Sequence, residues 1–148
     1  MVEMVLAFFG SLLPAILYNV SKKHFVWVGL SGVSGWMVYF WLSTGTGRII
    51  LATFAGAVSV GIYSEIMARC LKVPATIFSV SGIIPLVPGI GAYNAVQAIV
   101  ESNLGEAARL TVETIGSAGS IALGIMFSSA IFRAFRRRSQ EGKYFKKS

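Results

Sequence analysis

The sequence predicts an all-α integral membrane protein, a bundle of about five transmembrane helices. Of its 148 residues, 55% are hydrophobic and only 13% are charged, and the mean hydropathy is +0.71. Soluble domains carry about 25% charged residues because polar groups must cover their surface. A chain of this composition has too little polar surface for a water-soluble fold, and its length suits one domain.

The charged residues are spaced so that five apolar stretches remain. A helix needs about 20 apolar residues to cross the hydrocarbon core of a bilayer. We therefore predict one transmembrane domain over residues 1–148. Its predicted spans cover residues 4–21, 25–45, 49–68, 75–100 and 112–133, and residues 134–148 form a basic cytoplasmic tail.

The first predicted span could be taken for a secretion signal. A signal has a basic leader and a small-residue cleavage site, whereas this segment has Glu3 before it and Lys22 and Lys23 after it. We expect a retained first helix.

The third predicted span contains Glu65 near its inner end. An intramembrane carboxylate can carry a proton for coupled transport. Arg69 follows four residues later, in the favourable order for a helix ion pair. Of the two interpretations, the sequence favours the ion pair.

The fourth predicted span is broken at Pro85 to Pro88. Each proline lacks an N–H and clashes with the preceding turn, so two half-helices with an unwound linker are expected. The second half-helix would offer free N–H groups at Gly89, Ile90 and Gly91, which suit a carboxylate. Irregular backbone at membrane depth must be buried or line a wet cavity, and many transporters build substrate sites this way.

Polar side chains follow this break. Tyr93 and Gln97 are four residues apart and Asn94 lies beside them, so they share one helical face. We predict a substrate site made of Pro85, Pro88, Gly89, Gly91, Tyr93, Asn94 and Gln97. The alternative is a packing kink whose polar side chains bond to neighbouring helices, and the pattern alone leaves both open.

The last span has a start signal and a stripe of small residues. Asn103 and Glu106 have the spacing of a capping box, which predicts a helix start near Leu104. Small residues at four-residue spacing let helices approach closely in lipid. The stripe consists of Gly116, Ser120, Gly124 and Ser128, and the third span has a shorter one at Ala57 and Gly61.

The basic residues predict the orientation, since Lys and Arg are retained in the cytoplasm. With five spans, only Arg48 and Arg109 of the 13 Lys and Arg fall on one side. The N-terminus is therefore expected outside and the C-terminus in the cytoplasm. A basic run directly after a span is typical of an anionic-lipid anchor, so we expect contact with membrane lipid and not with nucleic acid.

The residue content is unfavourable for an enzyme. Asp is absent, and Cys70 and His24 are each the only residue of their type. Cys-based metal clusters and a Ser-His-Asp triad are therefore excluded. No catalytic residue, metal or cofactor is expected.

The segment from Ile84 to Gly89, followed by Tyr93, resembles a known family. Together with the Lys/Arg loop before it and the last span rich in glycine and serine, it resembles the C-terminal membrane half of the threonine/serine exporter family. The small stand-alone subunit of two-subunit members is the closer likeness. The specific part is Pro-x-x-Pro-Gly-x-x-x-Tyr.

The resemblance implies efflux of small hydrophilic metabolites across the bacterial cytoplasmic (inner) membrane, driven by an ion gradient. Threonine and serine are implied for fused members, and dicarboxylates such as succinate for some paired ones. Fused members also carry a larger N-terminal half without counterpart here, which implies a larger membrane subunit as partner. Self-association of this chain is a further expectation. A non-transporting scaffold or assembly subunit is the alternative function.

The charge distribution makes the topology testable. Reporter fusions are expected to place Lys143 in the cytoplasm and the Gly105 region outside, because the basic residues gather on one side. A fusion at Lys143 that reports from outside would contradict the five-span orientation.

Overall fold

The computed structural model describes the backbone of residues 2–145 and the side chains of residues 2–134, and all the regular secondary structure in this part of the chain is helical. Two short 3-10 turns, η1 (Lys22–His24) and η2 (Ile84–Leu86), accompany the helices. The α-helices are α1 (Val2–Leu17), α2 (Phe25–Thr46), α3 (Ile49–Leu71), α4 (Thr76–Ile83), α5 (Gly89–Val100) and α6 (Leu104–Phe145).

In the described part of the chain, three helical segments are long and apolar enough to cross a membrane: η1 with α2, α3, and α6 as far as Ala134. The bent pair of α4 with η2 and α5 makes a fourth if it counts as one span. These helices cover the last four predicted spans. The predicted tail at 134–148 continues α6 as far as Phe145, and its side chains beyond Ala134 lie outside the described residues.

The first predicted span, residues 4–21, is longer than the helix found there. With 16 residues, α1 is a shorter apolar helix than the three candidate spanning helices. It ends because Asn19 adopts a left-handed φ of 51°, and the N–H of Val20 donates to the C=O of Ala15 at 3.0 Å. This closure is typical of helix C-termini, and Asn is one of the few residues that tolerate it.

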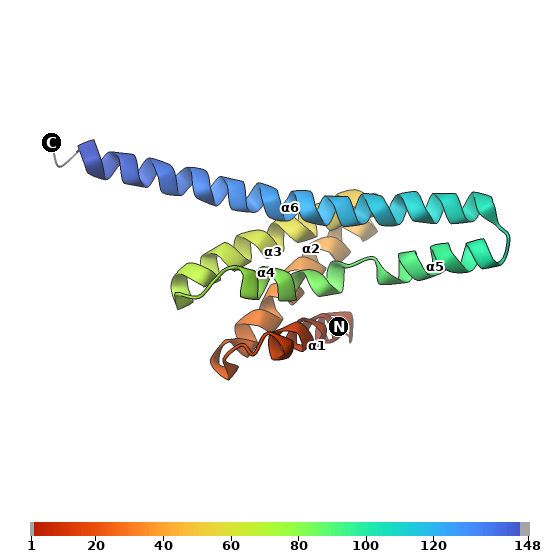
Figure 1. Ribbon diagram of the computed structural model, residues 1–148, viewed down its shortest axis with the longest axis horizontal. Coiled ribbons are helices and arrows are strands. Elements are labelled where there is room, and N and C mark those ends of the chain that lie inside the picture. Colours follow the sequence, from red (N-terminus) through yellow and green to blue (C-terminus); the bar gives the residue numbers. More distant parts are fainter. Residues whose placement is uncertain (1, 146–148) are drawn as a thin grey trace.

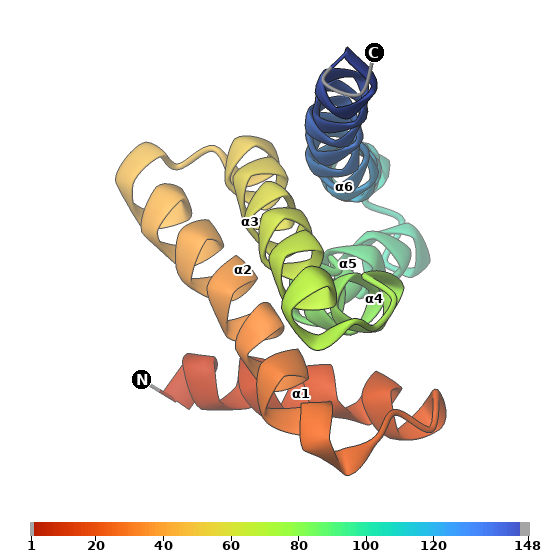
Figure 2. The same ribbon diagram turned by 90° about the vertical axis from the view of Figure 1, so that its left-hand side faces the viewer.

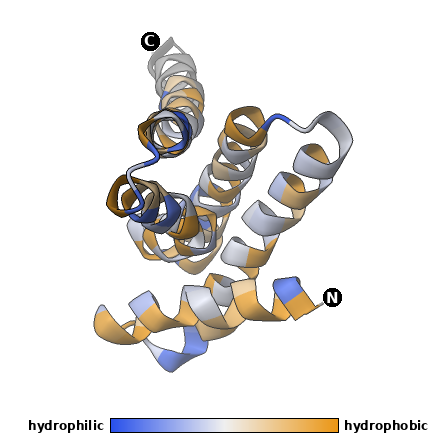
Figure 3. Ribbon diagram, turned by 90° about the vertical axis from the view of Figure 1, so that its right-hand side faces the viewer, coloured by the Kyte–Doolittle hydropathy of each residue, from blue (hydrophilic) through white to orange (hydrophobic). Residues whose placement is uncertain are grey.

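The helices do not form a parallel bundle. In Figure 1, α6 runs along the whole length of the molecule, and α4, η2 and α5 follow one another beneath it. Figure 2 shows α2 and α3 side by side, with α1 lying across the base of α2. In Figure 3, hydrophilic residues lie at the connections between helices and also within α5 and the start of α6, while most of the remaining helical residues are hydrophobic or intermediate.

Small residues form the contact between α3 and α6. A Cβ atom on Gly124 would lie 2.8 Å from the Cβ of Ala57 and 2.9 Å from the carbonyl oxygen of Phe54. Next along the same contact, a Cβ on Gly61 would overlap the hydroxyl of Ser128. The two predicted stripes therefore pack against each other within this chain, where backbones approach closely.

The glycines of α2 serve the other side of the bundle. Gly29 faces the ring of Phe8 in α1, and Gly35 faces Val60 in α3, so both neighbours can approach α2. Between them, the buried hydroxyl of Ser31 shares its proton between the C=O of Phe78 in α4 at 2.9 Å and the C=O of Val28 in its own helix at 2.8 Å. This bond ties α2 to the first half of the broken span.

The start of α6 follows the predicted cap in part. The helix begins at Leu104, and the N–H of Glu106 donates to Oδ1 of Asn103 at 3.3 Å. The reciprocal bond of a capping box is not formed. The Glu106 side chain instead accepts from Arg109, and the N–H of Asn103 donates to the C=O of Ala98.

We expect Gly124→Leu to destabilise the bundle, by about 1–3 kcal/mol or more, because the new side chain has no room against Ala57 and Phe54. Gly119→Leu is the matched control, since a Cβ on Gly119 meets nothing within 4 Å. Thermal unfolding of both purified variants in detergent measures the difference. Equal stability of the two variants would contradict this packing.

Candidate functional site

The predicted break is present between α4 and α5. The two helices are bent by 43° relative to each other, and the chain between them is irregular. The unwound part is shorter than predicted: Pro85 lies within the 3-10 turn η2, and only Val87 and Pro88 leave helical geometry. Pro85 is tolerated in η2 because the first residues of a helical turn need no intrahelical N–H bond.

The start of α5 offers two free N–H groups. The N–H of Gly89 is already used, since it donates to the C=O of Val87 at 2.7 Å. The N–H of Ala92 donates to the C=O of Pro88 at 3.0 Å. Within residues 2–145, the N–H groups of Ile90 and Gly91 have no acceptor. Of the three groups predicted to be free, Gly89 is therefore the exception.

A cavity of about 270 Å³ lies against this break. Its walls come from four parts of the chain: α2, α3, the segment from Pro85 to Gly91, and α6. The irregular backbone thus lines a cavity. This is expected, because lipid cannot hydrogen-bond to backbone groups that lack partners within a helix. The polar side chains among the lining residues are Trp36, Tyr39, Thr53, Glu113, Thr114 and Ser117.

The predicted polar face of α5 does not reach this cavity. Tyr93, Asn94 and Gln97 are exposed on the chain, with Tyr93 69% exposed. Gln97 donates from Nε2 to Oε1 of Glu101 at 2.8 Å. The predicted site is therefore divided: its prolines and glycines line the cavity, while its three polar side chains face outward from the chain.

A stripe of small residues on α5 determines which face of this helix packs against α6. Gly91, Ala95 and Ala98 have helical spacing, and the two alanines are buried where α5 packs against α6. A Cβ on Gly91 would come within 2.9 Å of the Thr114 hydroxyl. These small residues turn the bulkier polar face away from the bundle.

The sequence interpretation missed the carboxylate in the cavity wall. Glu113 lies on α6 within the apolar segment Leu104–Ala134, and its side chain is 30% exposed. The residue lies at the start of the predicted span 112–133, and the sequence pattern assigns it no role. The available signal was a charged residue inside a long apolar helix, which by itself suggests a functional position.

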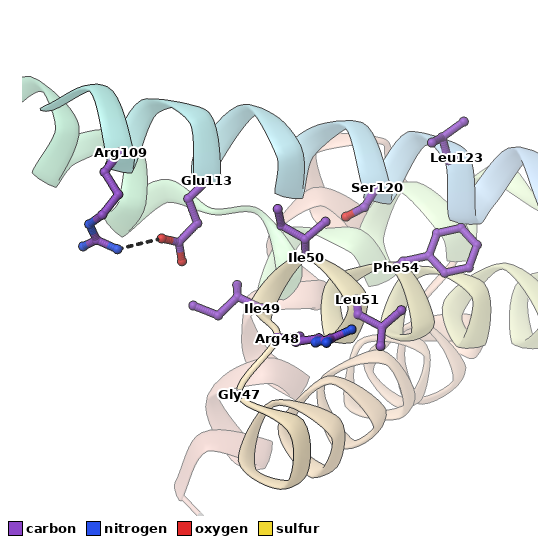
Figure 4. Close-up of a pocket in the computed structure, with 10 residues that line it drawn as sticks. All are labelled: Gly47, Arg48, Ile49, Ile50, Leu51, Phe54, Arg109, Glu113, Ser120 and Leu123. Atoms are coloured by element: carbon purple, nitrogen blue, oxygen red, sulfur yellow. Dashed lines mark hydrogen bonds and ion pairs between the residues drawn. The ribbon is translucent and has the colours of Figure 1, made fainter. Parts of the chain in front are cut away.

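A second, larger pocket of about 740 Å³ lies between the start of α3 and α6. Figure 4 shows Arg109 and Glu113 pointing toward one another from α6, with Glu113 near Ile49 and Ile50. Glu113 is a lining residue of both cavities.

Arg109 binds two carboxylates unequally. It donates to both oxygens of Glu106, from Nε at 3.0 Å and from Nη2 at 2.6 Å. Its Nη1 makes a single, longer contact of 3.3 Å with Glu113. Two-point carboxylate contacts are the stronger kind. Glu113 is therefore the more weakly held of the two partners.

The other singled-out carboxylate, Glu65, is paired at the far end of α3. Arg69 Nη2 lies 3.9 Å from Glu65 Oε2, with the side chains 52% and 24% exposed, respectively. The Arg69 guanidinium also lies 4.7 Å from the centre of the Phe132 ring on α6. The structure thus contains the ion pair that the spacing favoured.

With this geometry in hand, comparison with known proteins identifies the family. The family model described as "Threonine/Serine exporter, ThrE" matches residues 3–131. The chain belongs to the threonine/serine exporter family. This match covers α2, α3, the break and most of the apolar part of α6, and it supports an exporter role and a multi-pass membrane protein.

Among curated proteins, this exporter-family chain is similar to a threonine/serine exporter of Corynebacterium glutamicum. The two are 26% identical over 116 residues, which make up 78% of this chain but 24% of that protein. The chain thus spans about a quarter of the length of that relative. No solved structure matches it significantly.

We expect Glu65→Gln to lower the free energy of unfolding by at most about 1 kcal/mol, because the exposed ion pair with Arg69 is lost, and to leave the ion dependence of export unchanged. Denaturant unfolding of the single variants and of the double variant with Arg69→Gln measures the coupling between the two residues. A stable variant whose export no longer responds to the proton gradient would instead make Glu65 the coupling residue.

Proposed function

We propose that this chain is a subunit of a secondary transporter that exports a small carboxylate-bearing metabolite. The cargo is an amino acid such as threonine or serine, or a dicarboxylate such as succinate. The observation that carries the proposal is the break at Val87 and Pro88, whose backbone lines a cavity of about 270 Å³. The proposal includes no catalytic step.

The cavity suits weak, reversible binding of a carboxylate. The N–H groups of Ile90 and Gly91 lie at the start of α5, where the helix dipole favours negative charge. Gly89 leaves the approach open, since a Cβ there meets nothing within 4 Å. Drug-sized ligands occupy pockets of about 300–1,000 Å³, so the smaller cavity fits a small metabolite.

The arrangement of the connections supports the proposed orientation in the bacterial cytoplasmic membrane. In Figure 1, the connection from α1 to α2, the connection from α3 to α4 and the C-terminal end of α6 lie at the same end of the molecule. These are the segments that carry most of the Lys and Arg. We propose that this end faces the cytoplasm and that the chain crosses five times, with the N-terminus outside.

The outward face of α5 supports a partner. Tyr93, Asn94 and Gln97 are exposed on a helix that the proposal places in the membrane, where uncovered polar groups are unfavourable. A larger subunit of the same family, or a second copy of this chain, would cover them. The curated relative is also much longer than this chain. This agrees with a transporter in which this chain acts together with a larger subunit.

We expect Gly89→Val to reduce export at least tenfold at normal membrane levels, because the side chain obstructs approach to the N–H groups of α5. Gly105→Val is the matched control: Gly105 also lies in the first turn of a helix, and a Cβ there also meets nothing within 4 Å. Efflux from preloaded cells that carry each variant at the chromosomal locus measures the effect.

Gly91→Val and Gln97→Ala extend the same experiment. The first should act like Gly89→Val but with added strain against Thr114. The second should weaken recognition or subunit contact and leave the fold intact. If Gly89→Val, Gly91→Val and Gln97→Ala all export at the wild-type rate, the break is a packing feature, and the chain acts as a scaffold for a site elsewhere.

A further inference from the structure

The side chains that line the cavity at the break carry negative charge but no positive charge in the described part of the chain. Glu113 is its only charged lining residue, and no Lys or Arg side chain lines it in the described part of the chain. Opposite charges attract and like charges repel strongly where water is scarce. A cargo held here thus meets backbone N–H donors on α5 and a carboxylate on α6.

We propose that Glu113 selects cargo by charge: its carboxylate binds the ammonium group of a zwitterionic metabolite and disfavours a cargo with a second carboxylate. This inference rests on the proposed export function. It adds a choice among cargoes, because the N–H groups at the break would accept any carboxylate-bearing metabolite.

The contacts of Arg109 allow such an exchange. Glu113 is paired with Arg109 through a single 3.3 Å contact. When an ammonium group replaces that contact, Arg109 keeps both of its hydrogen bonds to Glu106. Neither the arginine nor the carboxylate is then left unpaired in a place where unpaired charge is costly. The ammonium group of the cargo therefore takes the place of the Arg109 guanidinium at Glu113.

The shape of the site fits the same cargo. The cavity volume of about 270 Å³ leaves room for one small metabolite between α5 and α6. The hydroxyls of Thr53 and Thr114 line it, and each donates to its own helix, to Ile49 and Leu110 respectively. Their oxygens remain acceptors for a hydroxyl or ammonium group of the cargo.

The test compares two probes, zwitterionic threonine and dianionic succinate, each preloaded into cells with the variant at the chromosomal locus. Wild-type cells should export threonine in preference to succinate. Glu113→Gln is isosteric and should lower the ratio of threonine to succinate export at least tenfold. Glu113→Asp keeps the charge and should keep the preference, and Glu3→Gln removes an exposed carboxylate outside this cavity as the matched control.

The amount of each variant in the membrane is measured alongside. Gly89→Val serves to distinguish failure of the proposed role of Glu113 from failure of the proposed export site at the break. If Gly89→Val abolishes export but Glu113→Gln leaves the ratio unchanged, the break is the site and the role of Glu113 is wrong. A wild-type preference for succinate would overturn the inference in the same way. If Gly89→Val, Gly91→Val and Gln97→Ala all export both probes normally, the proposed function itself fails.

Discussion

The backbone around Val87 and Pro88 has no regular helix to satisfy its N–H and C=O groups, and lipid offers no hydrogen bonds in exchange. Such a segment survives at membrane depth only if protein or a wet cavity surrounds it. The other helices provide part of this enclosure: Leu86 is buried against α2 and α3, and α6 runs along the other side of the break, whereas Val87 and Ile90 stay exposed on this chain. The arrangement of the bundle thus follows from one irregular stretch of backbone.

Close helix contacts make that enclosure possible. Apolar side chains gain little from meeting each other in lipid, so packing of small residues must hold the bundle. Gly124 against Ala57 fixes α6 on α3, and Gly35 against Val60 fixes α2 on α3. The buried Ser31 bond to Phe78 then fixes the first half of the broken span. These contacts position the walls of the cavity on three separate helices.

Local chemistry made the break and the helix contacts predictable from the sequence. Pro85 and Pro88 interrupt a helix in any surroundings, and the stripes of α3 and α6 can be recognised without knowing their partner. The face of α5 was different, because Tyr93 and Gln97 have the same helical spacing as Gly91 and Ala95. Only the close approach of α6 decides between the two faces. The position of Glu113 in the cavity wall depends on this same contact, so the sequence did not reveal it.

In the proposed mechanism, Glu113 takes part in both the binding and the release of the cargo. A transporter must bind its cargo tightly enough to recognise it and weakly enough to release it. In the proposed mechanism, α5 contributes N–H groups without a fixed positive charge, which limits how strongly a carboxylate is held. On α6, Arg109 competes with the cargo for Glu113 through its 3.3 Å contact. Return of Arg109 to Glu113 would therefore favour departure of the bound ammonium group. Glu113 and Arg109 both line the pocket of about 740 Å³, so the two groups that compete for Glu113 reach it from different pockets: Arg109 from the larger pocket and the cargo from the break cavity.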